Sequence, residues 1–153
     1  MRLWLLRHGQ AEAQTARDSE RALTAAGRAQ VLQALPWLRA CPPARALVSP
    51  YRRAQQTLEL LQAQLQLPLP AQTVDWLTPL SDPRQVLREL DAQGEGDLLL
   101  VAHQPLLGEL ASLLCHGHRQ QSLNLQTASL AELEGDFLLA GGFSLRALHH
   151  PEG

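Results

Sequence analysis

Residues 97–103 read Asp-Leu-Leu-Leu-Val-Ala-His, an uninterrupted apolar run that ends on a histidine. A short, continuous apolar run is typical of a parallel strand that is buried on both faces of a sheet. Arg2–Leu6 is a second run of this kind, and it ends abruptly at Arg7-His8-Gly9. We therefore predict two buried strands, each of which delivers polar side chains at its carboxyl end.

The segments around these two runs alternate between helical and strand patterns. This rhythm predicts an α/β fold, a three-layer sandwich with a mostly parallel central sheet, helices on both faces and a C-terminal edge hairpin. The chain is expected to form a single domain, residues 1–153, without a cap insertion. The other predicted elements are a helix capped by Thr24, a strand at 46–48, a helix opened by Ser49-Pro50, a strand at 72–74, helices from 83 to 90 and from Pro105, and a hairpin of 129–133 with 137–148.

Composition excludes several classes of function. All thirteen basic residues are arginine, so the chain offers no lysine to a P-loop nucleotide site or to Schiff-base chemistry. A net charge of −2 argues against nucleic acid as a partner, because backbone phosphates attract clustered positive charge. No apolar stretch approaches the roughly 20 residues of a membrane helix or resembles a signal peptide. We expect a cytoplasmic protein with no membrane partner, in which Cys41 and Cys115 are reduced.

Three polar clusters follow three predicted strands: Arg7-His8-Gly9, residues 49–53, and His103-Gln104. In open α/β sheets, ligands bind outside the carboxyl ends of the strands, so these clusters are expected to meet in one crevice. Arginines with planar, forked donors suit the oxygens of a phosphate dianion. Arg52 and Arg53 are neighbours on a helix and point about 100° apart, so only one of them is expected to face the crevice.

The chemistry expected at this crevice is phosphoryl transfer. His8, placed among cations, is expected to stay neutral and to act as a nucleophile toward phosphorus. His103 would bond a phosphoryl oxygen, and Gly9 would let the backbone approach the ligand closely. The helix that begins after Ser49 adds its positive dipole end. Because the arginines supply the charge that Mg²⁺ supplies elsewhere, we expect no metal and no cofactor.

The same residues resemble the motifs of the histidine phosphatase superfamily, the phosphoglycerate mutase-like proteins. Arg7-His8-Gly9 resembles the RHG signature, and residues 49–57 resemble the S-P-x-x-R-A-x-Q-T segment, in which Arg53 takes the clamp position. Residues 23–30 resemble the L-T-x-x-G-x-x-Q stretch, and residues 101–103 resemble the strand that carries the second histidine. RHG alone is a weak signal, but the four motifs together, in family order, are specific.

Within the superfamily, the short length, Leu77-Thr78-Pro79 and the His103-x-Pro105-Leu106 continuation are most similar to SixA-type phosphohistidine phosphatases. The resemblance implies that His8 takes the phosphoryl group from a phosphorylated histidine on a partner protein and is then released by water. The residues expected to hold the phosphoryl oxygens are Arg7, Arg53 and His103, with Gly9, Gln10, Ser49 and Gln104 as substrate-binding neighbours.

The leaving group can be argued from what the chain lacks. Only the 36 residues 61–96 separate Leu60 from Asp97, which leaves little room for a roof over the pocket. Where acid-phosphatase relatives place an Asp after the second histidine, this chain has Gln104. A weak or missing general acid suits the easily broken P–N bond of phosphohistidine, and an open mouth suits a phosphoryl group carried by a protein.

Alternatives stay open at this point. Glu12, Asp75 and Asp82 are candidate general acids, and Trp76, which stands where SixA-type relatives have a Glu, is expected at the pocket rim. The function could also be that of a small-molecule phosphomonoesterase of the same superfamily. A third hypothesis is a module that binds phosphorylated partners without turning them over, although a retained nucleophile beside its clamps argues against it.

Overall fold

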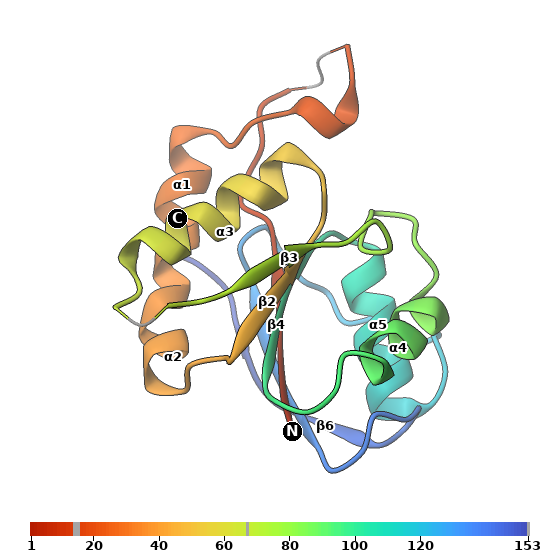
Figure 1. The fold of residues 1–153 in the computed structure, drawn as a ribbon. Helices are drawn as coiled ribbons and strands as arrows, with labels where there is room; N and C mark the ends of the chain where they lie inside the picture. Colours follow the sequence, from red (N-terminus) through yellow and green to blue (C-terminus); the bar gives the residue numbers. More distant parts are fainter. Residues whose placement is uncertain (14–15, 67, 153) are drawn as a thin grey trace.

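The computed structural model describes residues 1–13, 16–66 and 68–152. A six-stranded sheet runs through the middle of the molecule in the order β3-β2-β4-β1-β5-β6 (Figure 1). β1 to β4 are parallel, β5 is antiparallel to β1, and β6 is antiparallel to β5, so the predicted sheet and edge hairpin are confirmed. The strands are β1 (Arg2–Arg7), β2 (Arg45–Val48), β3 (Ala71–Thr73), β4 (Leu98–Ala102), β5 (Leu130–Gly135) and β6 (Phe143–His149).

Helices cover both faces of the sheet, as the alternating pattern predicts (Figure 1). One face carries α1 (Ala25–Val31), α2 (Leu35–Ala40) and α3 (Arg52–Gln64), and the other carries α4 (Pro83–Asp91) and α5 (Leu106–His116). The 3₁₀ turn η1 (Asp18–Glu20) precedes α1, and η2 (Leu32–Ala34) joins α1 to α2. Each face of the sheet buries its own apolar cluster. No helix in the described part of the chain is long and apolar enough to cross a membrane.

The apolar sequence of β4 follows from its place in the sheet. β4 lies between β2 and β1, and all five of its residues are fully buried. Leu98 and Leu100 pack in the cluster beneath α4 and α5, while Leu99 and Val101 pack in the cluster beneath α1, α2 and α3. Because strand side chains alternate between faces, both faces of β4 must be apolar. Because β1 and β2 both run parallel to β4, the carboxyl ends of the three strands meet at one edge of the sheet.

Two helix starts were predicted from capping patterns, and one of them is wrong. Thr24 caps α1 as expected, since its hydroxyl accepts the Gly27 N–H at 2.9 Å. The helix predicted to open with Ser49-Pro50 begins only at Arg52, and Tyr51 is its N-cap residue. The Ser49 hydroxyl is engaged by a histidine instead of by the helix.

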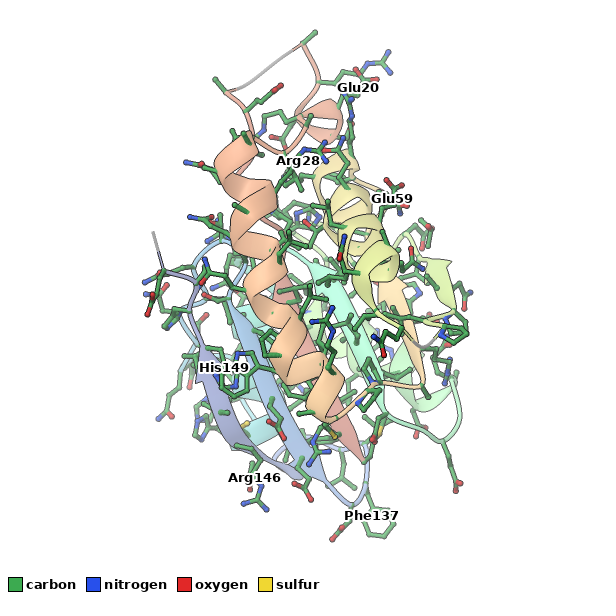
Figure 2. All side chains as sticks on the ribbon, turned by 90° about the vertical axis from the view of Figure 1, so that its left-hand side faces the viewer. Glu20, Arg28, Glu59, Phe137, Arg146 and His149 are labelled. Carbon is green, nitrogen blue, oxygen red and sulfur yellow. The ribbon has the colours of Figure 1, made fainter. Side chains whose placement is uncertain are left out.

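The turn of the C-terminal hairpin lies at the end of the molecule away from η1. Figure 2 shows Phe137, in this turn, at one end and Glu20, in η1, at the other. The far end of β6 is fastened to the helical face, because the His149 ring stacks on Trp37 of α2 with 3.9 Å between ring centroids. In the sheet, the hairpin of β5 and β6 lies at the edge opposite to β3 and β2.

Candidate active site

Four side chains from three strand ends converge at the carboxyl edge of the sheet. Arg7 ends β1 and His8 follows it, His103 follows β4, and Arg53 stands in the first turn of α3, which follows β2. The rings of His8 and His103 are 5.1 Å apart between centroids. Nε of Arg53 lies 3.2 Å from Nε2 of His8. The structure therefore brings the four predicted residues together, and they are called the quartet below.

The hydrogen bonds of His8 determine which of its ring nitrogens is free to react. Nδ1 lies 2.7 Å from the Gly9 carbonyl oxygen, which can only accept a hydrogen bond, so Nδ1 carries the ring proton. Nε2 then holds a lone pair, and this lone pair accepts the Nε–H of Arg53. His8 is thus a neutral imidazole, as a nitrogen nucleophile requires, and its lone pair faces the guanidinium of Arg53.

His103 is held by Ser49 at the end of β2. Nε2 of His103 is 2.7 Å from the Ser49 Oγ, which also accepts the Tyr51 N–H at 3.2 Å. The Ser49 hydroxyl can donate its proton to Nε2, and on that basis we assign the His103 ring proton to Nδ1. Nδ1 is buried and has no partner among the described residues. A buried donor in this state is suited to an oxygen of a bound anion.

Both imidazoles are held neutral by their surroundings. Burial is the largest cause that lowers the pKa of His8 to about 4, and the neighbouring arginine charges lower it further against the opposing effect of the Gly9 hydrogen bond. Burial, followed by the charges of His8 and the arginines, lowers the pKa of His103 to about 2. The neutral state expected for His8 agrees with this direction, but burial contributes more than the cations named in the sequence argument.

The two clamp arginines are fixed by backbone and aromatic contacts. Arg7 donates from Nη1 to the Leu125 carbonyl at 2.9 Å, and its buried Nε has no partner among the described residues. The Arg53 side chain is only 4% exposed, and its Cζ lies 5.0 Å from the centroid of the Tyr51 ring. Arg52 is exposed. The residue that faces the site is therefore Arg53, in agreement with the motif.

Gly9 is required for close packing, and its predicted role in letting the backbone approach a ligand stays a prediction. A Cβ at Gly9 would lie 2.7 Å from the Gly27 carbonyl oxygen, so the glycine lets the loop after β1 lie against α1. The Gly9 N–H donates to Thr57 Oγ1 at 3.1 Å and is directed at α3. Gln10 is exposed in the same loop, where its side-chain oxygen accepts the Thr24 hydroxyl at 3.0 Å.

Gln104 has both ends of its side-chain amide engaged by backbone groups. Nε2 donates to the Leu123 carbonyl at 3.0 Å, and Oε1 accepts the Gly108 N–H at 2.6 Å. The amide therefore fastens the start of α5 to the loop before β5. This use accounts for a glutamine directly after the second histidine, and its predicted contact with the substrate stays a prediction.

Asp18 is a site residue that the sequence reasoning missed. Its Oδ2 lies 3.2 Å from Nη2 of Arg53, and its carbonyl oxygen accepts Nη1 of Arg53 at 2.8 Å. Its Oδ1 accepts Nε of Arg21 at 2.9 Å. Burial raises the pKa of Asp18, but the charges and hydrogen bonds of Arg53 and Arg21 outweigh it and hold the pKa below its ordinary value. The i,i+3 spacing of Asp18 and Arg21 is a sequence signal, but it is a common one.

The candidate general acids have other surroundings. Asp82 caps α4, where its Oδ1 accepts the Arg84 N–H at 2.9 Å. Asp75 and Glu12 are exposed, and a role as general acid stays a prediction for both. Trp76 was predicted at the pocket rim, but it is buried in the apolar cluster beneath α4 and α5, so that prediction is wrong.

These features together could accommodate a tetrahedral anion beside a side chain that can act as a nucleophile. The groups that could donate to such an anion are Nε of Arg7, the guanidinium of Arg53 and Nδ1 of His103, and the atom that could act as the nucleophile is Nε2 of His8. Within the described residues, no group of three or more His, Cys, Asp or Glu side chains is placed to hold a metal ion. Oriented donors of this kind stabilise charge that develops on phosphoryl oxygens.

Known proteins are similar to this chain in sequence and in fold. The family model of the histidine phosphatase superfamily (branch 1) matches residues 3–78. The phosphohistidine phosphatase SixA of Escherichia coli (strain K12) is 38% identical in an alignment of length 122 that covers 76% of each chain. The chain belongs to the histidine phosphatase superfamily. Its RHG tripeptide and SPxxRA segment both lie within the residues that the family model matches.

Other members of the superfamily extend the match over nearly the whole chain. The phosphohistidine phosphatase SixA homolog of Haemophilus influenzae is 31% identical in an alignment of length 148 that covers 89% of each chain. Among solved structures, the protein histidine phosphatase SixA complexed with tungstate superposes with a TM-score of 0.88 at 33% identity, and the match covers 99% of this chain and 97% of that one. The three-layer α/β fold is that of these SixA proteins.

Proposed function

We propose that this chain is a phosphohistidine phosphatase, a hydrolase that breaks the P–N bond of phosphorylated histidine on a partner protein. The observation that carries the proposal is the neutral His8, whose Nε2 lone pair faces Arg53 while Nδ1–H is bonded to Gly9. The relatives named SixA, 38% and 31% identical, support the same activity. We propose one domain, residues 1–153, with no cap over the site.

Two transfers of the phosphoryl group make up the proposed reaction. In the first, Nε2 of His8 forms a bond to phosphorus as the P–N bond to the substrate imidazole breaks, and the departing nitrogen takes up a proton from solvent. In the second, the oxygen of a water molecule bonds to phosphorus, the P–N bond to His8 breaks, and orthophosphate leaves with the protons of that water. His8 returns to its neutral state with its proton on Nδ1.

The oxygens of the phosphoryl group are held by the same donors in both transfers. Nε of Arg7 and Nδ1 of His103 are buried donors that have no partner among the described residues, so each can bond an oxygen without giving up a contact. The guanidinium of Arg53 bonds a third oxygen and releases the lone pair of His8 as it does so. The donors gain most in the transition state, where charge collects on these oxygens.

The leaving group and the charge balance favour a P–N substrate and a reaction without a metal. An imidazole leaves phosphorus easily, so the reaction can proceed without a carboxylic acid beside the leaving atom. The positive charge that a phosphoryl group needs is provided by guanidinium groups of the chain itself. We therefore propose that the hydrolase is metal-independent and acts on a phosphohistidine-bearing domain.

A profile of turnover over three substrates tests this function. We expect kcat/KM on phosphoramidate and on a phosphorylated histidine domain to exceed that on a sugar phosphate by about tenfold or more, with turnover unchanged by EDTA. A clear preference for the ester would assign a small-molecule phosphomonoesterase instead. Phosphate binding without hydrolysis of any P–N or P–O substrate would assign a binding module, and loss of turnover in EDTA would contradict metal independence.

A further inference from the structure

Arg53 is attached to the protein at both ends of its guanidinium. On one side, Nε donates to Nε2 of His8 at 3.2 Å. On the other, Nη1 donates to the carbonyl oxygen of Asp18 at 2.8 Å and Nη2 pairs with the Asp18 carboxylate at 3.2 Å. A guanidinium is planar and rigid, so the group that holds its two Nη atoms also sets the direction of Nε. Asp18 therefore determines where Arg53 points.

The Asp18 carboxylate joins two cations of the site. Its second oxygen, Oδ1, accepts Nε of Arg21 at 2.9 Å, and the charge of Arg21 acts on both imidazoles by lowering the pKa of His8 and of His103. The carboxylate thus bridges Arg53 on α3 and Arg21 in the segment between η1 and α1. Among the described residues, Asp18 is the carboxylate that pairs with a clamp arginine, since Arg7 has its bond to a carbonyl.

Asp18 is not suited to donate a proton to the leaving group. Both of its carboxylate oxygens accept hydrogen bonds from guanidinium groups, so both favour the ionised form. The carboxylate side chain is 42% exposed, and an ion pair this open to solvent adds little to the stability of a fold. The carboxylate contacts Arg53 and Arg21, and η1 contributes no buried residue to the core.

We propose that Asp18 is a positioning residue for the phosphatase reaction, one that holds Arg53 beside His8 and keeps Arg21 at the same site. The proposal rests on the proposed role of His8 as nucleophile. Without the carboxylate, only the Tyr51 ring and the Asp18 carbonyl would hold the Arg53 guanidinium, and it would face the guanidinium groups of Arg7 and Arg21 without a counter-charge. Arg53 would then turn away from His8.

Kinetics of an Asp18→Ala variant provide the first test. We expect kcat/KM on phosphoramidate to fall by about 10- to 100-fold, the range that follows when a group that orients a catalytic contact is lost. Asp18→Asn should lose about as much, because an amide can present only one accepting oxygen to two guanidinium groups. The matched control is Glu20→Ala in the same 3₁₀ turn, whose carboxylate lies 3.9 Å from Arg17, and its kcat/KM should stay within about twofold.

The pKa of His8 separates positioning from simple charge balance. The groups that face His8 are Arg53, Arg7, Arg21, His103 and the Gly9 carbonyl. If Asp18 positions Arg53, the loss of Asp18 moves a cation away from His8, and the pKa of His8 rises. If Asp18 only balances charge, Arg53 stays in place unneutralised, and the pKa of His8 falls further.

An NMR titration of the His8 imidazole in Asp18→Ala therefore shows whether the pKa of His8 rises or falls. This measurement does not depend on any substrate. A rise in the pKa of His8, together with weaker binding of inorganic phosphate than in Glu20→Ala, supports the proposal. A fall in this pKa overturns the proposal, and so does an unchanged kcat/KM in Asp18→Ala when the wild type turns over substrate. If the wild type hydrolyses no substrate but the pKa still rises, the positioning role stands and the proposed function fails.

Discussion

A His8→Ala variant is expected to lose turnover on phosphoramidate by at least about 10³-fold in kcat. The alanine removes Nε2, the atom that bonds to phosphorus, while every donor to the phosphoryl oxygens remains. Binding of inorganic phosphate, followed by calorimetry, should weaken far less than turnover. The loss therefore belongs to the chemical step and not to the affinity of the site.

The matched control is His118→Ala, which removes a histidine outside the site whose Nδ1 accepts only the Gln120 N–H among the bonds described. Its kcat should equal that of the wild type within about twofold, since surface changes of this kind rarely disturb a fold. Circular dichroism would verify that both variants are folded. A His8→Ala variant that is folded and retains a tenth or more of the wild-type kcat would remove His8 from the mechanism.

The second large effect is expected from Arg53→Lys, a substitution that keeps the charge and removes the fork. A lysine ammonium cannot reach His8, Asp18 and a phosphoryl oxygen at once, whereas the guanidinium carries five N–H donors in a rigid fork and can serve these partners together or in turn. We expect kcat/KM on phosphoramidate to fall by about 10²-fold, similar to the loss of one oriented donor to a developing anion.

Arg52→Lys serves as the control for this variant, because Arg52 is the adjacent arginine on the same turn of α3 and its side chain is exposed. Its kcat/KM should remain within about twofold of the wild type on a small substrate. An Arg53→Lys variant that also stays within about twofold would mean that positive charge alone, without the guanidinium geometry, is what the site requires.

Much of the fold could be predicted because it depends on local pattern. The apolar run of β4 reflects burial on both faces, and the helical spacing after Thr24 reflects the stripe that packs on the sheet. The quartet followed from the same patterns, since parallel strands place their carboxyl ends at one edge. Arg7, His8 and His103 were found because they directly follow strands that the sequence marks clearly.

The contacts that hold the quartet could not be predicted, because their partners lie far apart in the chain. Ser49 is 54 residues from His103, and Asp18 is 35 residues from Arg53. In each case a short polar side chain has a plausible local role, such as the helix cap predicted at Ser49, and only the packing of the strands shows the actual partner. Gly9 is similar, since its close neighbour Gly27 belongs to a helix that folds back over the loop.

The central claim is that His8 carries the phosphoryl group between the two transfers. The most direct measurement is to quench the wild-type protein in base during turnover of phosphoramidate and to locate the phosphoryl group by mass spectrometry. We predict a phosphoryl group on His8 that survives base and is lost in acid, that is present in His118→Ala and that is missing from His8→Ala. An acid-stable adduct, or a phosphoryl group on any other residue, would contradict the account.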